Sequence, residues 1–153
     1  MDDIDRKIIA LLCEDARRSF ADIGFAVSLS APAVKRRVDR LRENGVITGF
    51  TAVVTPDALG WTTEAFIELF CAGRTSPAKI QAAARQLPEV VGAYTVSGGA
   101  DALVHLRAAD IAHLEQVLER LRGEPFVTQT RSMIVLSRLV DRPGVSETPS
   151  TLD

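Results

Sequence analysis

Residues 30–49, SAPAVKRRVDRLRENGVITG, predict the helix around which the rest of the chain can be interpreted. One narrow apolar stripe recurs at positions i, i+4 and i+7, namely Val34, Val38 and Leu41. Ser30 is suited to cap the start, and Pro32 fits a first turn, where a missing N–H costs nothing. Asn44-Gly45 predicts a left-handed stop. The stretch therefore predicts a short amphipathic helix with clear ends.

The polar side of this helix is mostly cationic. Its charged residues are Lys35, Arg36, Arg37, Arg40 and Arg42, set against Asp39 and Glu43. Arg36 falls nearly opposite the apolar stripe, at the most exposed position. A buried stripe with a basic outer face suits the major groove of DNA. The alternative is a solvated amphipathic helix, which most basic helices are.

Upstream residues favour the first interpretation. Residues 2–15 predict a helix with acids at its favourable N-terminal end and one apolar face. That face is formed by Ile4, Ile8, Leu11 and Leu12. Ser19 is suited to cap a second, short helix through Ala21, Ile23, Phe25 and Ala26, and residues 27–30 lead directly into the basic helix. Three helices with a tight turn before the last predict a helix-turn-helix domain.

Composition supports a globular protein with a local basic site. The chain has 153 residues, 46% hydrophobic and 25% charged, which fits one ordinary domain or two small ones. Its net charge is −2, yet residues 30–42 hold five Lys/Arg against one acid, whereas residues 51–153 hold nine against twelve. A protein that merely coats nucleic acid is expected to be basic overall. This distribution favours an oriented contact.

Other functional classes find little support. Cys13, on the inner side of the first helix, and Cys71, near the end of a strand, are expected to be small core residues. There is no Cys-x-x-Cys, His cluster or nucleophile motif, so we expect no metal, no cofactor and no enzyme activity. His105 and His113 are interpreted as structural or solvent-facing. No apolar signal region or membrane-spanning stretch is seen, so the cytoplasm is the default location.

The second half alternates between strand and helix patterns. The β-rich run at residues 50–54 predicts a strand that links two domains. Beyond it we expect strands at 64–72, 90–97, 101–107 and 127–139 and helices at 76–87 and 110–123. The order β-α-β-β-α-β is that of the ferredoxin-like fold. The predicted class is α+β, with a helix-turn-helix domain at 1–47, a linker strand at 48–60, a ferredoxin-like domain at 61–142 and a loose tail at 143–153.

The predicted sheet has helices on one face only, so its other face needs a partner. The strand residues that favour such a partner are Phe66, Leu69, Phe70, Val104, Leu106, Ile134 and Leu136. A two-fold homodimer is the simplest solution. Such a dimer presents two basic helices to two half-sites, which increases affinity without a new contact.

Over residues 2–142 the chain resembles the Lrp/AsnC (feast/famine) transcriptional regulators. The residues that carry the resemblance are Asp3–Ile9 with Leu11-Leu12, Asp15–Arg17, Leu29-Ser30, Pro32–Val34, Arg36–Val38, Arg40-Leu41 and Gly45–Phe50. Gly98-Gly99-Ala100-Asp101 resembles the family's Gly-x-x-Asp turn. Two positions depart from the pattern: Ser28 replaces the usual turn glycine, and Gly24 replaces a small alanine at a helix-propensity cost of about 1 kcal/mol.

The resemblance implies an amino-acid-responsive, DNA-binding regulator whose C-terminal domain is of the ACT-like (RAM) type. Family members dimerise through this domain and often form tetramers or octamers, and they commonly bind a free amino acid between paired domains. In the effector turn, Gly99 and Ala100 replace bulkier residues of many members.

The candidate DNA-binding residues are Arg17, Arg18, Ser30, Pro32, Ala33, Lys35, Arg36, Arg37, Arg40 and Arg42. We expect Arg36 to contact a base edge and Arg37, Arg40, Arg42, Arg17 and Arg18 to contact phosphates. The alternative is that Arg37 or Arg40 pairs with Asp39 or Glu43 on the helix surface.

The candidate effector residues are Thr95, Gly98, Gly99, Ala100 and Asp101. Free N–H groups of the turn are expected to hold a carboxylate while Asp101 faces an ammonium group. Alternatively, the glycines only form a tight hairpin and Asp101 only accepts turn N–H groups.

Two further functions remain open on sequence grounds. One is a metabolite-binding or enzymatic ferredoxin-like protein whose N-terminal helices serve assembly. The other is RNA binding, for which stacking aromatic residues on an exposed sheet are expected, and an aromatic content of 5% gives this little support.

Overall fold

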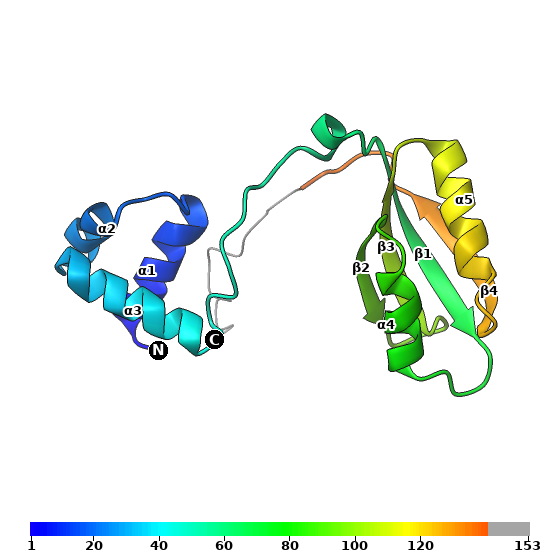
Figure 1. The fold of residues 1–153 in the computed structure, drawn as a ribbon, viewed down its shortest axis with the longest axis horizontal. Coiled ribbons are helices and arrows are strands. Elements are labelled where there is room, and N and C mark those ends of the chain that lie inside the picture. Colours follow the sequence, from blue (N-terminus) through cyan, green and yellow to red (C-terminus); the bar gives the residue numbers. More distant parts are fainter. Residues whose placement is uncertain (141–153) are drawn as a thin grey trace. The chain divides into compact units, whose positions relative to one another are not determined.

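A computed structural model of the protein describes residues 1–140 and contains two compact units, Met1–Val53 and Val54–Leu139 (Figure 1). The first unit contains α1 (Asp3–Glu14), α2 (Phe20–Val27) and α3 (Ala31–Glu43). The second contains the 3-10 helix η1 (Pro56–Leu59), β1 (Thr63–Cys71), α4 (Pro77–Arg85), β2 (Val90–Thr95), β3 (Ala102–Ala108), α5 (Ile111–Arg122) and β4 (Val127–Ile134). The expected tail at 143–153 and the expected domain end at 142 lie outside the described residues.

Local signals in the sequence account for most helix ends. Asp2 caps α1 in a capping box, because its carboxylate accepts from the Asp5 amide while the Asp5 carboxylate accepts from the Asp2 amide. Ser19 caps α2 through a hydrogen bond from the Asp22 amide. Gly45 follows α3 with φ 68°, as expected. Ser30 precedes α3, but its hydroxyl makes no capping bond, contrary to expectation.

The apolar faces predicted for the three helices meet in one small core. Its buried members are Ile8, Leu12, Ile23, Val34 and Val38. Two other residues of these helices are exposed to solvent, and for one of them this contradicts the prediction. Cys13 is exposed and not a core residue, because it follows Leu12 by about 100° around the helix. Phe25 lies on the outer face of α2 and is 92% exposed.

The tight turn between α2 and α3 restricts which residues suit positions 24 and 28. The Leu29 amide donates to the Gly24 carbonyl at 2.9 Å, and a Cβ at Gly24 would lie only 2.4 Å from the Leu29 oxygen. Gly24 is therefore required by a close backbone approach, which outweighs its lower helix propensity. Ser28 occupies the left-handed conformation, with φ 57°, where glycine is usual.

The second unit has the predicted β-α-β-β-α-β order. Its four strands form one antiparallel sheet in the order β2-β3-β1-β4. Side chains of α4 and α5 pack on the same face of this sheet, against the inward residues of β1 and β3 (Figure 1). Burial alternates along β1, so Ile67 and Leu69 are buried while Phe66 and Phe70 point to the open face.

Three sequence predictions about strands are wrong in detail. Residues 50–54 form no strand in the described part of the chain, because no neighbouring strand there pairs with their backbone. The last strand ends at Ile134 rather than at residue 139, and Leu136 beyond it is 95% exposed. Leu69, Val104 and Leu106 point toward the helices and not toward the open face, with exposures of 2%, 0% and 0%. Ile134 lies on the same side of the sheet, because it is paired with the inward-facing Ala65.

A buried acid joins β2 to α5 on the helix side of this unit. Glu89 is buried, and its Oε1 lies 3.1 Å from Nε2 of His113 and 3.3 Å from Nη1 of Arg120. Burial opposes ionisation of Glu89, but hydrogen bonds from its own backbone and from His113 hold its pKa below the ordinary value. Trp61 stacks on His113, with ring centroids 6.1 Å apart.

Candidate nucleic-acid interface and effector turn

Two of the cations on α3 have no partner within residues 1–140. Arg36 is exposed, lies opposite the buried stripe and makes no hydrogen bond or ion pair there, and Arg42 is likewise unpaired. Lys35 is exposed but is bound at 2.6 Å to Asp39 one turn later. Near the helix start, Ser30 and Pro32 are exposed and Ala33 is half-buried. The N-terminal half of α3 therefore presents one uncompensated cation among small residues.

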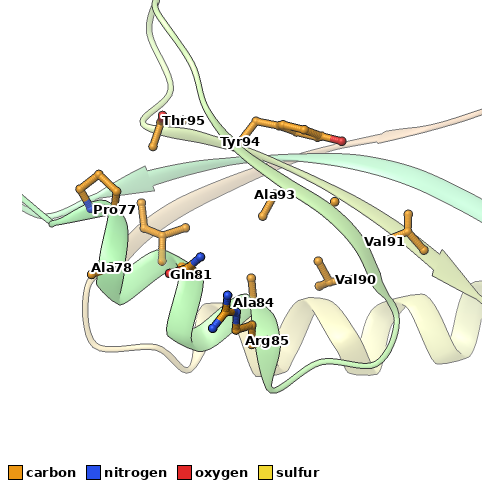
Figure 2. Close-up of a pocket in the computed structure, with 12 residues that line it drawn as sticks. Pro77, Ala78, Gln81, Ala84, Arg85, Val90, Val91, Ala93, Tyr94 and Thr95 are labelled. Carbon is orange, nitrogen blue, oxygen red and sulfur yellow. The ribbon is translucent and has the colours of Figure 1, made fainter. Parts of the chain in front are cut away.

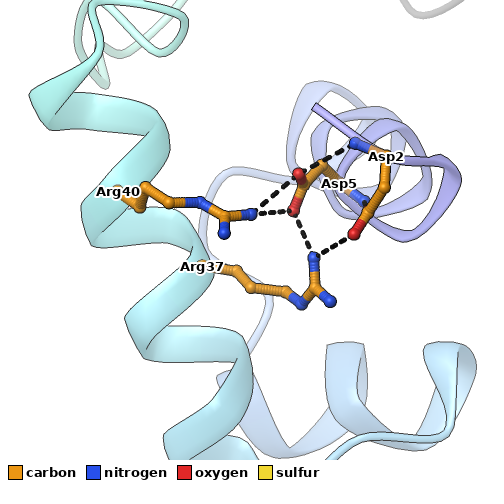
Figure 3. Close-up of polar contacts among 4 residues, drawn as sticks. All are labelled: Asp2, Asp5, Arg37 and Arg40. Atoms are coloured by element: carbon orange, nitrogen blue, oxygen red, sulfur yellow. Dashed lines mark hydrogen bonds and ion pairs between the residues drawn. The ribbon is translucent and has the colours of Figure 1, made fainter.

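Arg37 and Arg40 have acidic partners on α1 (Figure 3). Nη1 of Arg37 lies 2.7 Å from Oδ2 of Asp2 and 2.8 Å from Oδ1 of Asp5. Nη2 of Arg40 lies 3.1 and 2.9 Å from the two carboxylate oxygens of Asp5. The sequence-based alternative placed Asp39 or Glu43 opposite these arginines. The partners come instead from another helix, 32 to 35 residues away in the chain.

We call these four residues the α1–α3 clamp. Asp5 is fully buried, while the side chain of Arg37 is 23% exposed and that of Arg40 is 52% exposed. Hydrogen bonds from the Arg37 side chain and the Asp5 backbone lower the pKa of Asp2 to about 2. For Asp5, burial is the largest effect and works against ionisation, but the hydrogen bonds from Arg37 and from the Asp2 backbone, together with the charge of Arg40, outweigh it and the pKa is lowered. Both carboxylates of the clamp are therefore charged at neutral pH.

The two remaining candidate cations lie between α1 and α2. Arg17 is exposed, its backbone amide donates to Asp15, and its guanidinium has no partner in the part of the chain that the structure describes. Arg18 makes a long contact of 3.4 Å with Glu14. Such an exposed pair is worth little, so both side chains can be drawn to phosphates.

The effector turn joins β2 to β3 and has free donors. Gly98 has φ 139°, which favours glycine, and open space surrounds the Cβ positions of Gly98 and Gly99. No hydrogen bond within residues 1–140 uses the amides of Gly98, Gly99 or Ala100. The Asp101 amide, in contrast, donates to the Leu69 carbonyl at 2.9 Å. Oδ2 of Asp101 accepts from the Cys71 amide at 2.7 Å, so Asp101 also ties the turn to β1.

Thr95 pairs with Ala102 at the base of this turn but does not share a cavity with the turn residues. It lines a groove of about 540 Å³ between α4 and β2, which Gly98 to Asp101 do not line. Figure 2 shows Val90 and Ala93 directed toward α4, with Tyr94 on the other side of β2. Within one chain, therefore, the five expected effector residues do not form one cavity.

Residues 1–140 contain neither a metal-binding cluster nor a membrane-spanning helix. No group of three or more His, Cys, Asp or Glu side chains is placed to hold a metal ion. None of the described helices is long and apolar enough to cross a membrane.

Comparison with known families matches both halves of the chain. Residues 1–42 match the AsnC-type helix-turn-helix domain, and residues 64–145 match the Lrp/AsnC ligand binding domain. The chain is 55% identical over 142 residues to the HTH-type transcriptional regulator Rv2324 of Mycobacterium tuberculosis, covering 93% of this chain and 96% of that protein. It is 36% identical to the regulator FL11 of Pyrococcus furiosus, covering 89% of each.

Solved structures show the same fold. The structure of Escherichia coli AsnC matches with a TM-score of 0.89 at 26% identity, covering 96% of this chain and 99% of that one. A feast or famine regulatory protein from M. tuberculosis, Rv3291c, solved as a complex with L-methionine, matches with a TM-score of 0.87 at 31% identity, covering 95% and 99%.

Proposed function

Because the chain belongs to the Lrp/AsnC family of DNA-binding transcriptional regulators, we propose that it places α3 in the major groove of specific duplex sites and responds there to a free amino acid. The observation that carries the DNA-binding part is Arg36. It is the exposed, unpaired cation opposite the buried stripe of α3 and near its N-terminal end, which is the end that contacts bases in helix-turn-helix proteins.

The candidate DNA-binding residues are assigned different roles according to the partners they have in the fold. Arg36 contacts a base edge, with guanine the best match for a guanidinium. Unpaired or weakly paired cations contact phosphates and set the register, namely Arg17, Arg18 and Arg42. Ser30, Pro32 and Ala33 are small enough for close approach, and Lys35 flanks them. Arg37 and Arg40 remain in the clamp, where Asp2 and Asp5 compensate most of their charge.

Replacement of Arg36 tests this assignment. A duplex is first selected from a random library by the unsubstituted protein, and binding is then compared with a random duplex of equal length. Arg36→Ala should weaken binding to the selected duplex by about 1–3 kcal/mol, and binding to the random duplex much less. Arg85→Ala removes an arginine of α4 that has no partner within residues 1–140, and it serves as the charge-matched control.

Equal losses on the two duplexes would make Arg36 a phosphate contact. If the unsubstituted protein showed no salt-dependent binding to any duplex, DNA recognition itself would be excluded and a metabolite-binding protein favoured. A true interface predicts a slope of log K against log salt near −0.9 for each phosphate neutralised.

The effector response is proposed to lie at the β2–β3 turn. The free amides of Gly98, Gly99 and Ala100 suit an amino-acid carboxylate, and the second carboxylate oxygen of Asp101 suits its ammonium group. A relative of 31% identity was solved with L-methionine, which supports an amino acid as the ligand class. Thr95 belongs to this site only if a second copy of the chain completes it, because one chain leaves it apart.

Calorimetric titration with free amino acids, starting with L-methionine, tests the turn. Asp101→Asn keeps an acceptor for the Cys71 amide but removes the charge, so it should weaken amino-acid binding at least about tenfold while preserving the fold. Asp57→Asn removes an acid of η1 whose side chain makes no hydrogen bond or ion pair within the described residues, and it serves as the control. Identical isotherms for the two variants would remove Asp101 from the site.

Homodimerisation is proposed to occur through the open face of the sheet. This face carries large side chains that no helix covers, namely Phe66, Phe70, Tyr94, Leu103 and Met133. Phe66 stacks on His105 with centroids 4.5 Å apart, and Arg131 lies over the Phe70 ring. An apolar sheet face of this kind favours pairing with a second copy. Larger assemblies, such as a tetramer or octamer, would join these dimers through other surfaces.

A further inference from the structure

We propose that Asp2 and Asp5 are positioning residues for DNA recognition: by holding Arg37 and Arg40 they fix the rotation of α3 and withhold two cations from the phosphates. This inference rests on the proposed function, because it concerns how α3 meets DNA. It goes further in assigning a role in specificity to two acids that never touch a base.

The burial of Asp5 makes the clamp hard to open. Its side chain is 1% exposed, and both of its oxygens accept hydrogen bonds from arginines of α3 (Figure 3). If Arg37 left for a phosphate, Asp5 would lose one of the two guanidinium partners that compensate its buried charge. An uncompensated buried charge is strongly destabilising. Arg37, whose own side chain is only 23% exposed, therefore stays on α1 when DNA is present.

The spacing of the four residues fixes the rotation of α3. Asp2 and Asp5 lie three residues apart around the first turn of α1, and Arg37 and Arg40 lie three apart on α3. Apolar packing of the Val34–Val38 stripe is non-directional, so it permits small rotations. Charge-assisted hydrogen bonds are directional and strong. Two of them one turn apart hold Arg36 at a fixed angle to the groove.

The clamp also reduces binding that ignores sequence. Two carboxylates offset two guanidiniums, so the clamp compensates two of the five cations between residues 30 and 42, in addition to Lys35, which Asp39 pairs. Each cation that neutralises a phosphate adds to affinity for every duplex, whatever its sequence. Withholding Arg37 and Arg40 therefore leaves a larger share of the binding free energy to Arg36.

Two isosteric variants in the same helical turn test the proposal. Asp2→Asn removes one of the two charged partners of Arg37, leaving Asp5, and keeps a good capping residue. Asp3→Asn makes the same change of charge at a side chain that is 87% exposed and contacts only Arg6 of its own helix. Both are compared on a selected and a random duplex over a range of salt concentrations.

The clamp predicts different outcomes for the two variants. In Asp2→Asn the ratio of selected to random affinity should fall about three- to tenfold, with a steeper salt slope on random DNA, as expected for loss of a half-exposed charge-assisted hydrogen bond. In Asp3→Asn both affinities should shift by one common factor. If Asp2→Asn also shifted both by one factor, the acid would act only by charge repulsion and the proposal would be overturned.

A double-mutant cycle with Arg37→Gln supplies a second readout. Once Arg37 is absent, Asp2→Asn should change the affinity ratio no further, and the two changes should also couple in urea unfolding without DNA. Additive effects in both measurements would overturn the clamp even if one variant folded poorly. If the unsubstituted protein bound no duplex while the unfolding cycle showed coupling, the proposed function would fail instead.

Discussion

Two residues in the helix-turn-helix corner show how close backbone contacts override helix propensity. Judged by propensity, Gly24 is a weak point of α2, and alanine would be the better residue. In the fold, the Leu29 carbonyl occupies the space that an alanine methyl group would need. Ser28 supplies the left-handed turn at a steric cost that glycine would avoid. By backbone propensity alone, serine would suit position 24 better than glycine does, and glycine would suit position 28 better than serine does.

Gly24→Ala should destabilise the helical unit by about 1–3 kcal/mol, because Leu29 must shift to relieve a 2.4 Å contact. Ser28→Gly should stabilise it by about 0.5–1 kcal/mol, because φ 57° no longer carries a Cβ penalty. Urea unfolding followed by far-ultraviolet circular dichroism measures both. A stabilising Gly24→Ala would show that the corner is looser than the geometry indicates.

At the scale of elements, helix and strand positions were predictable where one period dominates. The stripes of α1 and α3 and the alternation in β1 each have a clear period, and the predicted bounds differ from those observed by one or two residues. The last strand was predicted too long because the apolar residues after Ile134 favour a strand as strongly as those before it. The residue types alone do not show where the neighbouring strand ends and pairing stops.

The predicted linker strand illustrates the same limit. Residues 50–54 have the β-branched composition of a strand, but a strand needs a second backbone to accept and donate its hydrogen bonds. None is available in the part of the chain that the structure describes.

Side-chain partners between elements were the least predictable part of the site. Exposure of Arg36 followed from its angle to the stripe, and it is exposed in the structure. The partners of Arg37 and Arg40 did not follow, because helix geometry ranks only neighbours three or four residues away. The available signal was a pair of acids at positions 2 and 5 that matches a pair of arginines at 37 and 40 in spacing. It becomes interpretable only once α1 is known to cross α3.

For the whole molecule, assembly decides whether the open sheet face is stable. The sequence predicted an uncovered apolar face correctly but assigned four helix-facing residues to it, because the phase of a strand cannot be read from composition. The face that is actually open combines Phe66 and Phe70 with charged pairs such as Arg131–Glu68. Aromatic residues and arginine are enriched at interfaces between proteins, so this face favours assembly.

Phe66→Glu should convert the expected dimer to monomer, raising its dissociation constant at least about a hundredfold, because an unpaired carboxylate in a desolvated interface costs several kcal/mol. Phe25→Glu places the same charge on the 92%-exposed face of α2 and should leave the dimer intact. Sedimentation velocity at micromolar concentration measures both. An unsubstituted protein that sedimented as a monomer would remove the open face from any role in assembly.

The stacking of Trp61 on His113 has a practical consequence. Trp61 is the only indole of the chain, and it belongs to the unit that contains the sheet. Its fluorescence therefore follows the melting of that unit alone, whereas the ellipticity of the helices follows both. Whether a ligand bound to one unit raises the melting temperature of the other unit can thus be measured without attaching a dye.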